Sequence, residues 1–228
     1  MVREIGYNKH VNERKAVLHR RNEEKKEKER KKKMIKNGLY YRINSADEFE
    51  MVGLKDGMKR VIVPAFMERL NGELFGFHST ITKFVVEKGN ERYFTQGNCL
   101  IERDRTWGFW YRGNVLIAGC RNSIIPADGS ISVIAPRAFA GKAPKRVVIP
   151  EGVKLIAYRA FADSQDLASV YIPASVQEMQ SPFERCNNLK EIVFGGMREQ
   201  WERITCGKPM NPYGVEPTIY FEQETRCA

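Results

Sequence analysis

The sequence predicts an α/β repeat solenoid of units of about 22–23 residues, each with one short strand and one helical turn, preceded by an exposed N-terminal helix. Phenylalanine recurs in a single phase, at Phe139, Phe161 and Phe183. Short β-like runs that end in Pro or Gly recur in the same phase, as VVIPEG, VYIPAS and IVFGGM. Upstream of these runs, residues 12–36 contain no Gly or Pro and consist mainly of strong helix formers.

A basic arm, residues 1–37, is expected to form the N-terminal helix. Residues 1–36 contain 14 Lys and Arg against six Asp and Glu, so they carry +8 of the formal net charge of +10. Glu24 and Lys28 form one of several Glu–Lys pairs at the four-residue spacing that stabilises helices. No apolar stripe accompanies these charges, so the helix should stand in solvent and end at a cap formed by Asn37-Gly38.

The remaining region, residues 38–228, is expected to be the solenoid. A unit of about 22 residues cannot bury its own apolar face, so successive units must stack to make a continuous core. Within a unit, Val147 and Ile149 should point inward and Val148 outward, because side chains alternate along a strand. The Ala-Phe segment should form a helical turn that places its Phe in the core.

The repeat phase also extends upstream. Pro126 precedes Pro150 in a matching SIIPADG segment, and RVIVPAF places Pro64 in a comparable context. We therefore expect one array over residues 39–196, with an insert at about 90–120 and a C-terminal cap at about 195–228. The sequence leaves open whether Trp201 alone closes the array or PTIYFEQ adds a last strand.

These units resemble BspA-like leucine-rich repeats. The segments that carry the resemblance are IAYRAFADSQDLASVYIPASV and MQSPFERCNNLKEIVFGG. The stretch from GNCLIERD to SVIAPRAFAG resembles a two-stranded insert common in that family, and VFGGMREQWERI resembles its closing unit, in which Trp201 would cap the core. Ser164 stands where the family often has Cys, and Met179 where it usually has Ile. The resemblance implies a leucine-rich-repeat fold and, most often, surface adhesion.

Enzymatic motifs are absent from the sequence. It has no P-loop, no dinucleotide-binding glycine motif, no serine-hydrolase elbow and no HExxH motif. Two of the three histidines lie in the arm, and the five cysteines show no CxxC spacing. We therefore expect no enzymatic activity, no cofactor and no metal site, and cysteines that serve as small buried side chains.

The first candidate binding surface is a row of outward strand residues, called here the apolar ladder. Its members are Ile62, Val85, Ile124, Val148, Tyr171 and Val193. Basic residues border it: Lys59, Arg60, Lys83, Lys145, Arg146 and Lys190. A partly exposed apolar row with a basic border favours a protein partner. The alternative is that β-branched residues merely suit strands and are covered by another segment.

The second candidate surface is an aromatic hairpin within the insert. Its residues are Trp107, Phe109, Trp110 and Tyr111, between Arg105 and Arg112. Trp107, Phe109 and Tyr111 should share one face and Trp110 the other. Exposed aromatics of this kind favour protein or sugar partners. Packing of one face against the solenoid is the competing interpretation.

The third candidate is a nucleic-acid-binding surface on the arm, formed by Lys25, Lys26, Lys28, Arg30, Lys31, Lys32 and Lys33. These residues could neutralise phosphates of nucleic acid, or the arm could be a solvated spacer. The main hypothesis is a non-enzymatic scaffold that binds a protein of unknown identity, with unknown oligomeric state. Nucleic-acid association through the arm is one alternative.

The expected location is the cytoplasm. The first 30 residues lack the apolar run of roughly 7–15 residues that a signal peptide requires, and no stretch is apolar enough for a membrane span. Adhesion at the cell surface becomes the alternative if a leader has been removed.

Overall fold

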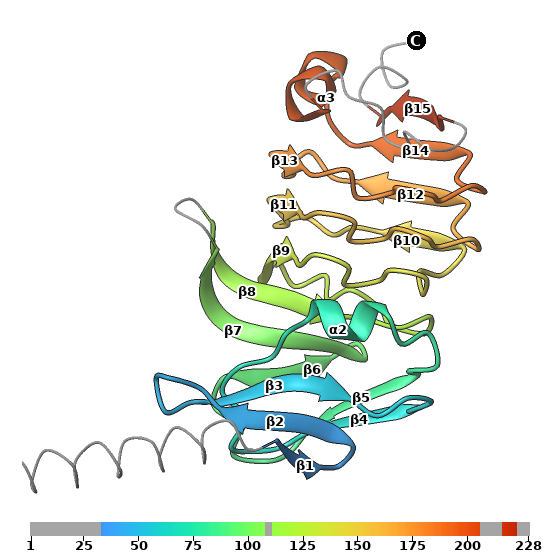
Figure 1. The fold of residues 1–228 in the computed structure, drawn as a ribbon. Coiled ribbons are helices and arrows are strands. Elements are labelled where there is room, and N and C mark those ends of the chain that lie inside the picture. The colour runs from blue at the N-terminus through green and yellow to red at the C-terminus, as the bar shows by residue number, and fades with distance from the viewer. Residues whose placement is uncertain (1–32, 108–110, 206–215, 223–228) are drawn as a thin grey trace, which may run out of the picture.

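Parallel strands stacked coil upon coil form the C-terminal part of the molecule, and mainly antiparallel strands form its N-terminal part (Figure 1). The computed structural model describes residues 33–107, 111–205 and 216–222. Within them the chain forms four sheets and two short helices, α2 (Glu73–Gly76) and α3 (Arg198–Thr205). Neither helix is long and apolar enough to cross a membrane.

Two small sheets begin the described chain. β1 (Met34–Lys36), β2 (Leu39–Ile43) and β3 (Phe49–Leu54) form an antiparallel sheet in chain order. β4 (Arg60–Val63) and β5 (Lys83–Val86) form a parallel pair. Within the region expected to be the array, the chain before β4 therefore turns back on itself in hairpins, and β4 and β5 are the first parallel pair.

A six-stranded sheet follows, in the order β13-β11-β9-β8-β7-β6. Its antiparallel part contains β6 (Tyr93–Gln96), β7 (Cys99–Trp107) and β8 (Tyr111–Ala118), which occupy the expected insert. Its parallel part contains β9 (Ile131–Ile134), β11 (Leu155–Ile156) and β13 (Glu178–Met179). The insert is thus joined to the coils by hydrogen bonds between β8 and β9.

The fourth sheet is parallel and supplies the other side of each coil. It consists of β10 (Arg146–Val148), β12 (Ser169–Ile172), β14 (Glu191–Phe194) and β15 (Thr218–Phe221). Val147, Val170 and Ile192 are aligned in neighbouring strands and are buried, so the alternation expected from the sequence is confirmed here. β15 pairs in register with β14, which shows that PTIYFEQ does add a last strand.

The Ala-Phe segments are stacked turns, so the prediction of helical turns, and with it the α/β class, is wrong. The N–H of Phe139 donates to the oxygen of Ala160 at 2.7 Å, and the equivalent N–H of Phe161 donates to Pro182 at 2.9 Å. Arg137 lies within this turn and has a φ of 56°. A helix would direct these N–H groups along its own axis, whereas the left-handed residue turns them toward the next coil. The fold is a β-solenoid.

The core contains a column of aromatic rings. Phe139 and Phe161 stack with ring centroids 5.1 Å apart, and Phe183 continues the column at 5.7 Å. At the C-terminal end, Trp201 from α3 lies buried against Phe194, at 5.3 Å between centroids. Trp201 therefore covers the end of the core as the resemblance implied, and β15 covers it as well.

Ser164, which stands where the repeat pattern often has Cys, makes the same hydrogen bond as the Cys of the next coil. The Ser164 hydroxyl donates to the oxygen of Phe139 at 3.1 Å, and the Cys186 thiol, one coil further on, donates to Phe161 at the same distance. Cys99, Cys120 and Cys186 are buried free thiols, as expected for small core residues. Cys206 and Cys227 lie outside the described residues.

The prediction of an N-terminal helix is wrong for its last residues, which form a strand. Residues 34–36 form β1, which pairs with β2 through a two-residue turn at Asn37 and Gly38, with φ of 54° and 78°. Positive φ at both turn residues is the geometry of a type I′ hairpin, for which Asn-Gly is the preferred sequence. Lys36 also forms an ion pair of 3.0 Å with Glu87. Residues 1–32, where the rest of the predicted helix falls, lie outside the described part.

Candidate functional site

The C-terminal half of the apolar ladder is aligned across one sheet. Val148, Tyr171 and Val193 are register partners in β10, β12 and β14. The side chain of Val148 is 66% exposed, whereas Tyr171 and Val193 are half-buried. Tyr220 in β15 pairs with Val193 and is 51% exposed, so it extends the row. The repeat pattern missed Tyr220 because it does not reach β15.

The N-terminal half of the apolar ladder lies in a different sheet. Ile62 and Val85 are register partners in β4 and β5, and both are half-buried. Ile124 belongs to no strand; its side chain is 75% exposed, and its N–H donates to Gly97 at 2.8 Å. The ladder is therefore two aligned groups with Ile124 between them. The six bordering basic residues, Lys59, Arg60, Lys83, Lys145, Arg146 and Lys190, are all exposed.

The described part of the aromatic hairpin packs against the solenoid. Trp107 and Tyr111 are register partners at the ends of β7 and β8, so they share a face as predicted. Both are half-buried and contact the core cluster of the N-terminal half. The Tyr111 hydroxyl donates to Glu178 at 3.1 Å, and burial and this contact raise the pKa of Tyr111. Phe109 and Trp110 lie outside the described residues.

Of the seven basic residues proposed for nucleic acid, the structure describes Lys33 alone. Its ammonium lies 4.2 Å from the centre of the Tyr40 ring, a cation–π contact that attaches it to β2. Lys25, Lys26, Lys28, Arg30, Lys31 and Lys32 lie outside the described residues.

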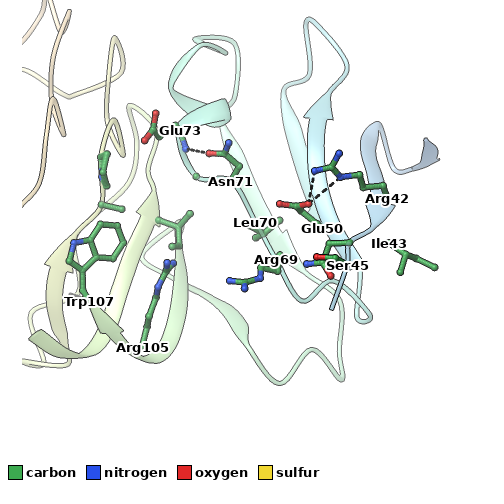
Figure 2. A pocket seen from close by; sticks show the side chains of 15 residues that line it. Arg42, Ile43, Ser45, Glu50, Arg69, Leu70, Asn71, Glu73, Arg105 and Trp107 are labelled. Carbon is green, nitrogen blue, oxygen red and sulfur yellow. Dashed lines mark hydrogen bonds and ion pairs between the residues drawn. The ribbon is translucent and has the colours of Figure 1, made fainter. Parts of the chain in front are cut away.

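A cleft of about 640 Å³ separates the N-terminal sheet from the β7–β8 hairpin (Figure 2). Figure 2 shows Arg69 on one side and Arg105 with Trp107 on the other. Arg69 donates to Glu48 at 2.7 Å, and Arg105 donates at 2.7 Å to Glu102, which is 1% exposed. Because each guanidinium already has a carboxylate partner, the cleft offers little excess charge to a ligand. Sequence patterns could not identify it, since its residues come from distant segments.

The described residues offer no evident metal centre. Across residues 33–107, 111–205 and 216–222, no group of three His, Cys, Asp or Glu side chains could hold a metal ion. The strand face remains the surface on which exposed apolar side chains are most regularly aligned.

Comparison with known proteins identifies the type of repeat in the C-terminal coils. Residues 116–204 match the model of the BspA type leucine rich repeat region, in six copies. The chain is also similar to the crystal structure of a leucine-rich repeat protein from Eubacterium ventriosum, with a TM-score of 0.51 and 18% identity over 65% of this chain and 42% of that chain. At this identity the likeness supports the fold.

A second similar structure is the pneumococcal vaccine antigen PcpA, with a TM-score of 0.49 and 18% identity over 61% of this chain and 39% of that chain. The chain thus spans about two fifths of the length of these two proteins. The search of curated proteins found no significant match.

Proposed function

We propose that this chain, with its BspA-type leucine-rich repeat region at 116–204, is a non-enzymatic scaffold that binds a protein partner. The observation that carries the proposal is the aligned row Val148–Tyr171–Val193–Tyr220 on the strand face. The ends of this row are more than half exposed, although a monomer usually buries such side chains or scatters them singly. Aromatic members of a contiguous surface row are typical anchors of protein interfaces.

The basic border indicates the charge of the partner. Lys145 lies just before β10, Arg146 begins it and Lys190 lies just before β14, and all three are exposed. An acidic surface around an apolar patch would complement them and would speed association. The aromatic hairpin is the second part of the proposed contact surface, with Trp110 as the residue expected on its outer face.

The test uses a photo-crosslinking residue at Val193 of the full chain, followed by identification of crosslinked proteins from the native host. We expect one protein to crosslink at this position, and Tyr171→Ala or Trp110→Ala to reduce its yield. Tyr158→Ala is the matched control for Tyr171→Ala, because Tyr158 is 46% exposed but lies beside β11, in the sheet that does not contain the ladder. Equal yields from the wild type and both ladder and hairpin variants would refute the proposed surface.

Nucleic-acid binding is the alternative, favoured by the +8 charge of residues 1–36. It predicts that binding to duplex DNA or RNA falls steeply with salt, because phosphate neutralisation releases counterions. Changing Lys25, Lys26 and Lys28 to Gln in the full chain should weaken binding and reduce the salt slope by roughly one unit for each phosphate that is no longer neutralised. Salt-independent binding, or binding unaffected by these changes, would exclude this role.

Cell-surface adhesion is a second alternative and concerns where the same scaffold acts. Protease treatment of intact host cells should release peptides of this chain if it is displayed outside. Peptides recovered from lysed cells but not from intact cells would contradict surface display and would favour the cytoplasmic prediction.

A further inference from the structure

On the strand side, no backbone hydrogen bond between described residues joins β10 to the coil before it. Upstream, the Asn98 side chain accepts from Phe84 N–H at 3.1 Å, and Ile124 N–H donates to Gly97 at 2.8 Å. Downstream, β10 is hydrogen-bonded to β12, as shown by Ile149 N–H donating to Tyr171 at 2.9 Å. Between residues 123–125 and β10, no backbone hydrogen bond joins the described residues.

The unpaired groups can be assigned from the pairing of β10. The oxygen of Lys145 accepts from Ala168 N–H at 2.8 Å, and Ile149 donates toward β12, so odd-numbered residues direct their main-chain groups to that strand. Because successive residues of a strand direct these groups to opposite sides, those of Arg146 and Val148 face residues 123–125. Within the described chain neither residue has a backbone partner on that side. β10 therefore has a free edge in the middle of the stack.

A pocket of about 300 Å³ lies at this edge. Its floor includes the buried side chains of Phe139 and Val147, and its walls are formed by Ile124 and Val148. Both wall residues are largely exposed, and most of the lining side chains are apolar. An extended chain that carries an apolar side chain can replace the water on these main-chain groups and fill the apolar pocket at the same time.

The charge around the pocket further defines the occupant. Arg146 lines it, and Lys145 lies next to it in the sequence; both are exposed, and neither forms an ion pair with a described residue. Arg121 and Lys145 line a neighbouring groove. Arg121 already forms an ion pair with Asp166. Two free cations at the rim favour an occupant with acidic residues beside its apolar segment.

We propose that the free edge of β10 takes up an extended segment of a protein partner, with an apolar centre and acidic flanks. The segment adds as a strand, exchanging main-chain hydrogen bonds with Arg146 and Val148 while one side chain enters the pocket above Phe139. This inference rests on the proposed scaffold function and names the recognition mode within it. Main-chain bonds supply affinity in this mode, and the pocket supplies specificity.

The test uses the full chain and fluorescein-labelled heptapeptides. Their three central positions carry every combination of Val, Ile, Leu and Phe, and two acidic residues stand at each end. We expect at least one peptide to raise fluorescence anisotropy saturably and to slow hydrogen exchange of the Val148 amide. N-methylation of alternate central residues should weaken binding roughly tenfold per main-chain bond removed, since it blocks these bonds and keeps the side chains.

Variants of the edge complete the test. Val148→Pro removes the outward N–H without removing a bond to β12, so it should abolish peptide binding and leave the sheet folded. If that variant fails to fold by circular dichroism, Ile124→Asp alters the opposite wall through an exposed side chain. Arg146→Glu should weaken binding, whereas Lys88→Glu, an exposed charge change just after β5, should not.

Several results would overturn the proposal. They are binding by no peptide, binding insensitive to N-methylation, or binding equal in the wild type and the edge variants. Slow exchange of the Val148 amide in the free chain would instead assign the edge to another segment of this chain. A concentration-dependent dimer that Val148→Pro abolishes would assign it to a second copy. Partner crosslinking at Val193 that persists while all peptides fail would reject the β10 edge but leave the scaffold function intact.

Discussion

Replacement of Lys142 by Met is expected to stabilise the fold at neutral pH. The side chain of Lys142 is 2% exposed, and its Nζ donates to the main-chain oxygen of Phe75 at 2.7 Å, which connects a repeat turn to α2. Burial lowers the pKa of Lys142 from 10.5 to about 8, against a smaller opposing influence from Cys120. At neutral pH the folded protein therefore keeps a charge in a site that disfavours it.

The size of the effect follows from this shift. A pKa change from 10.5 to about 8 corresponds to about 3 kcal/mol of destabilisation of the folded state below pH 8. Met loses the hydrogen bond of Nζ, at a cost of about 1–2 kcal/mol, but the Phe75 oxygen still accepts from His78 N–H at 3.2 Å. We therefore expect a net gain of about 1–2 kcal/mol in the free energy of unfolding at pH 7.

The pH dependence separates this cause from simple repacking. Between about pH 8 and pH 10.5 the unfolded chain binds more protons at Lys142 than the folded chain, so the stability of the wild type rises with pH there. Met does not titrate, so the variant's advantage of about 1–2 kcal/mol at pH 7 should fall by about 3 kcal/mol across this window and become a disadvantage of about 1–2 kcal/mol. Urea unfolding at several pH values measures this difference, with Lys190→Met at an exposed position as the control. An advantage that stays constant with pH would refute the reasoning.

Three further predictions concern the core. Phe161→Ala removes the ring between Phe139 and Phe183 and should cost about 3–5 kcal/mol in urea unfolding, because the column cannot close over the cavity. Glu102→Gln should cost about 1–3 kcal/mol by calorimetry, since it leaves the arginines paired with Glu102 without a charge partner while they remain about one-third exposed. Burial raises the pKa of Cys99 to about 12 and that of Cys186 to about 11, so a thiol reagent at mildly alkaline pH should modify neither until the protein is unfolded, as mapped by mass spectrometry.

The repeat phase could be predicted because the same physical demand recurs in every coil. Phe139, Phe161 and Phe183 must stack on one another, and the outward positions Val148 and Tyr171 must follow the same register. Residues that recur at a fixed spacing in the sequence therefore occupy equivalent positions in successive coils. This reasoning placed the strands of the fourth sheet and the members of the apolar ladder within it.

The conformation of the turns could not be predicted in the same way. An Ala-Phe pair suits a helical turn as well as a stacked turn, and the left-handed residues Arg137 and Arg159 carry no marker such as Gly. Asn37-Gly38 was similarly ambiguous, because a helix cap and a hairpin both use positive φ at such positions. The pairing of β1 with β2 makes this segment a hairpin, and such pairing depends on contacts between segments that the local sequence does not specify.

At residues 123–125 the local sequence pattern and the tertiary pairing disagree. The SIIPADG segment repeats the strand-and-turn pattern of VVIPEG, yet Ile124 bonds back to Gly97 and leaves the edge of β10 open. Proteins usually shorten, charge or cover such an edge, because unpaired main-chain groups cost free energy and invite unwanted pairing. β10 is short and begins with the exposed Arg146, but the exposed side chains of Ile124 and Val148 leave its apolar part accessible. A local disagreement that persists without a structural benefit is characteristic of functional sites, so the β10 edge is the first place to search for the partner.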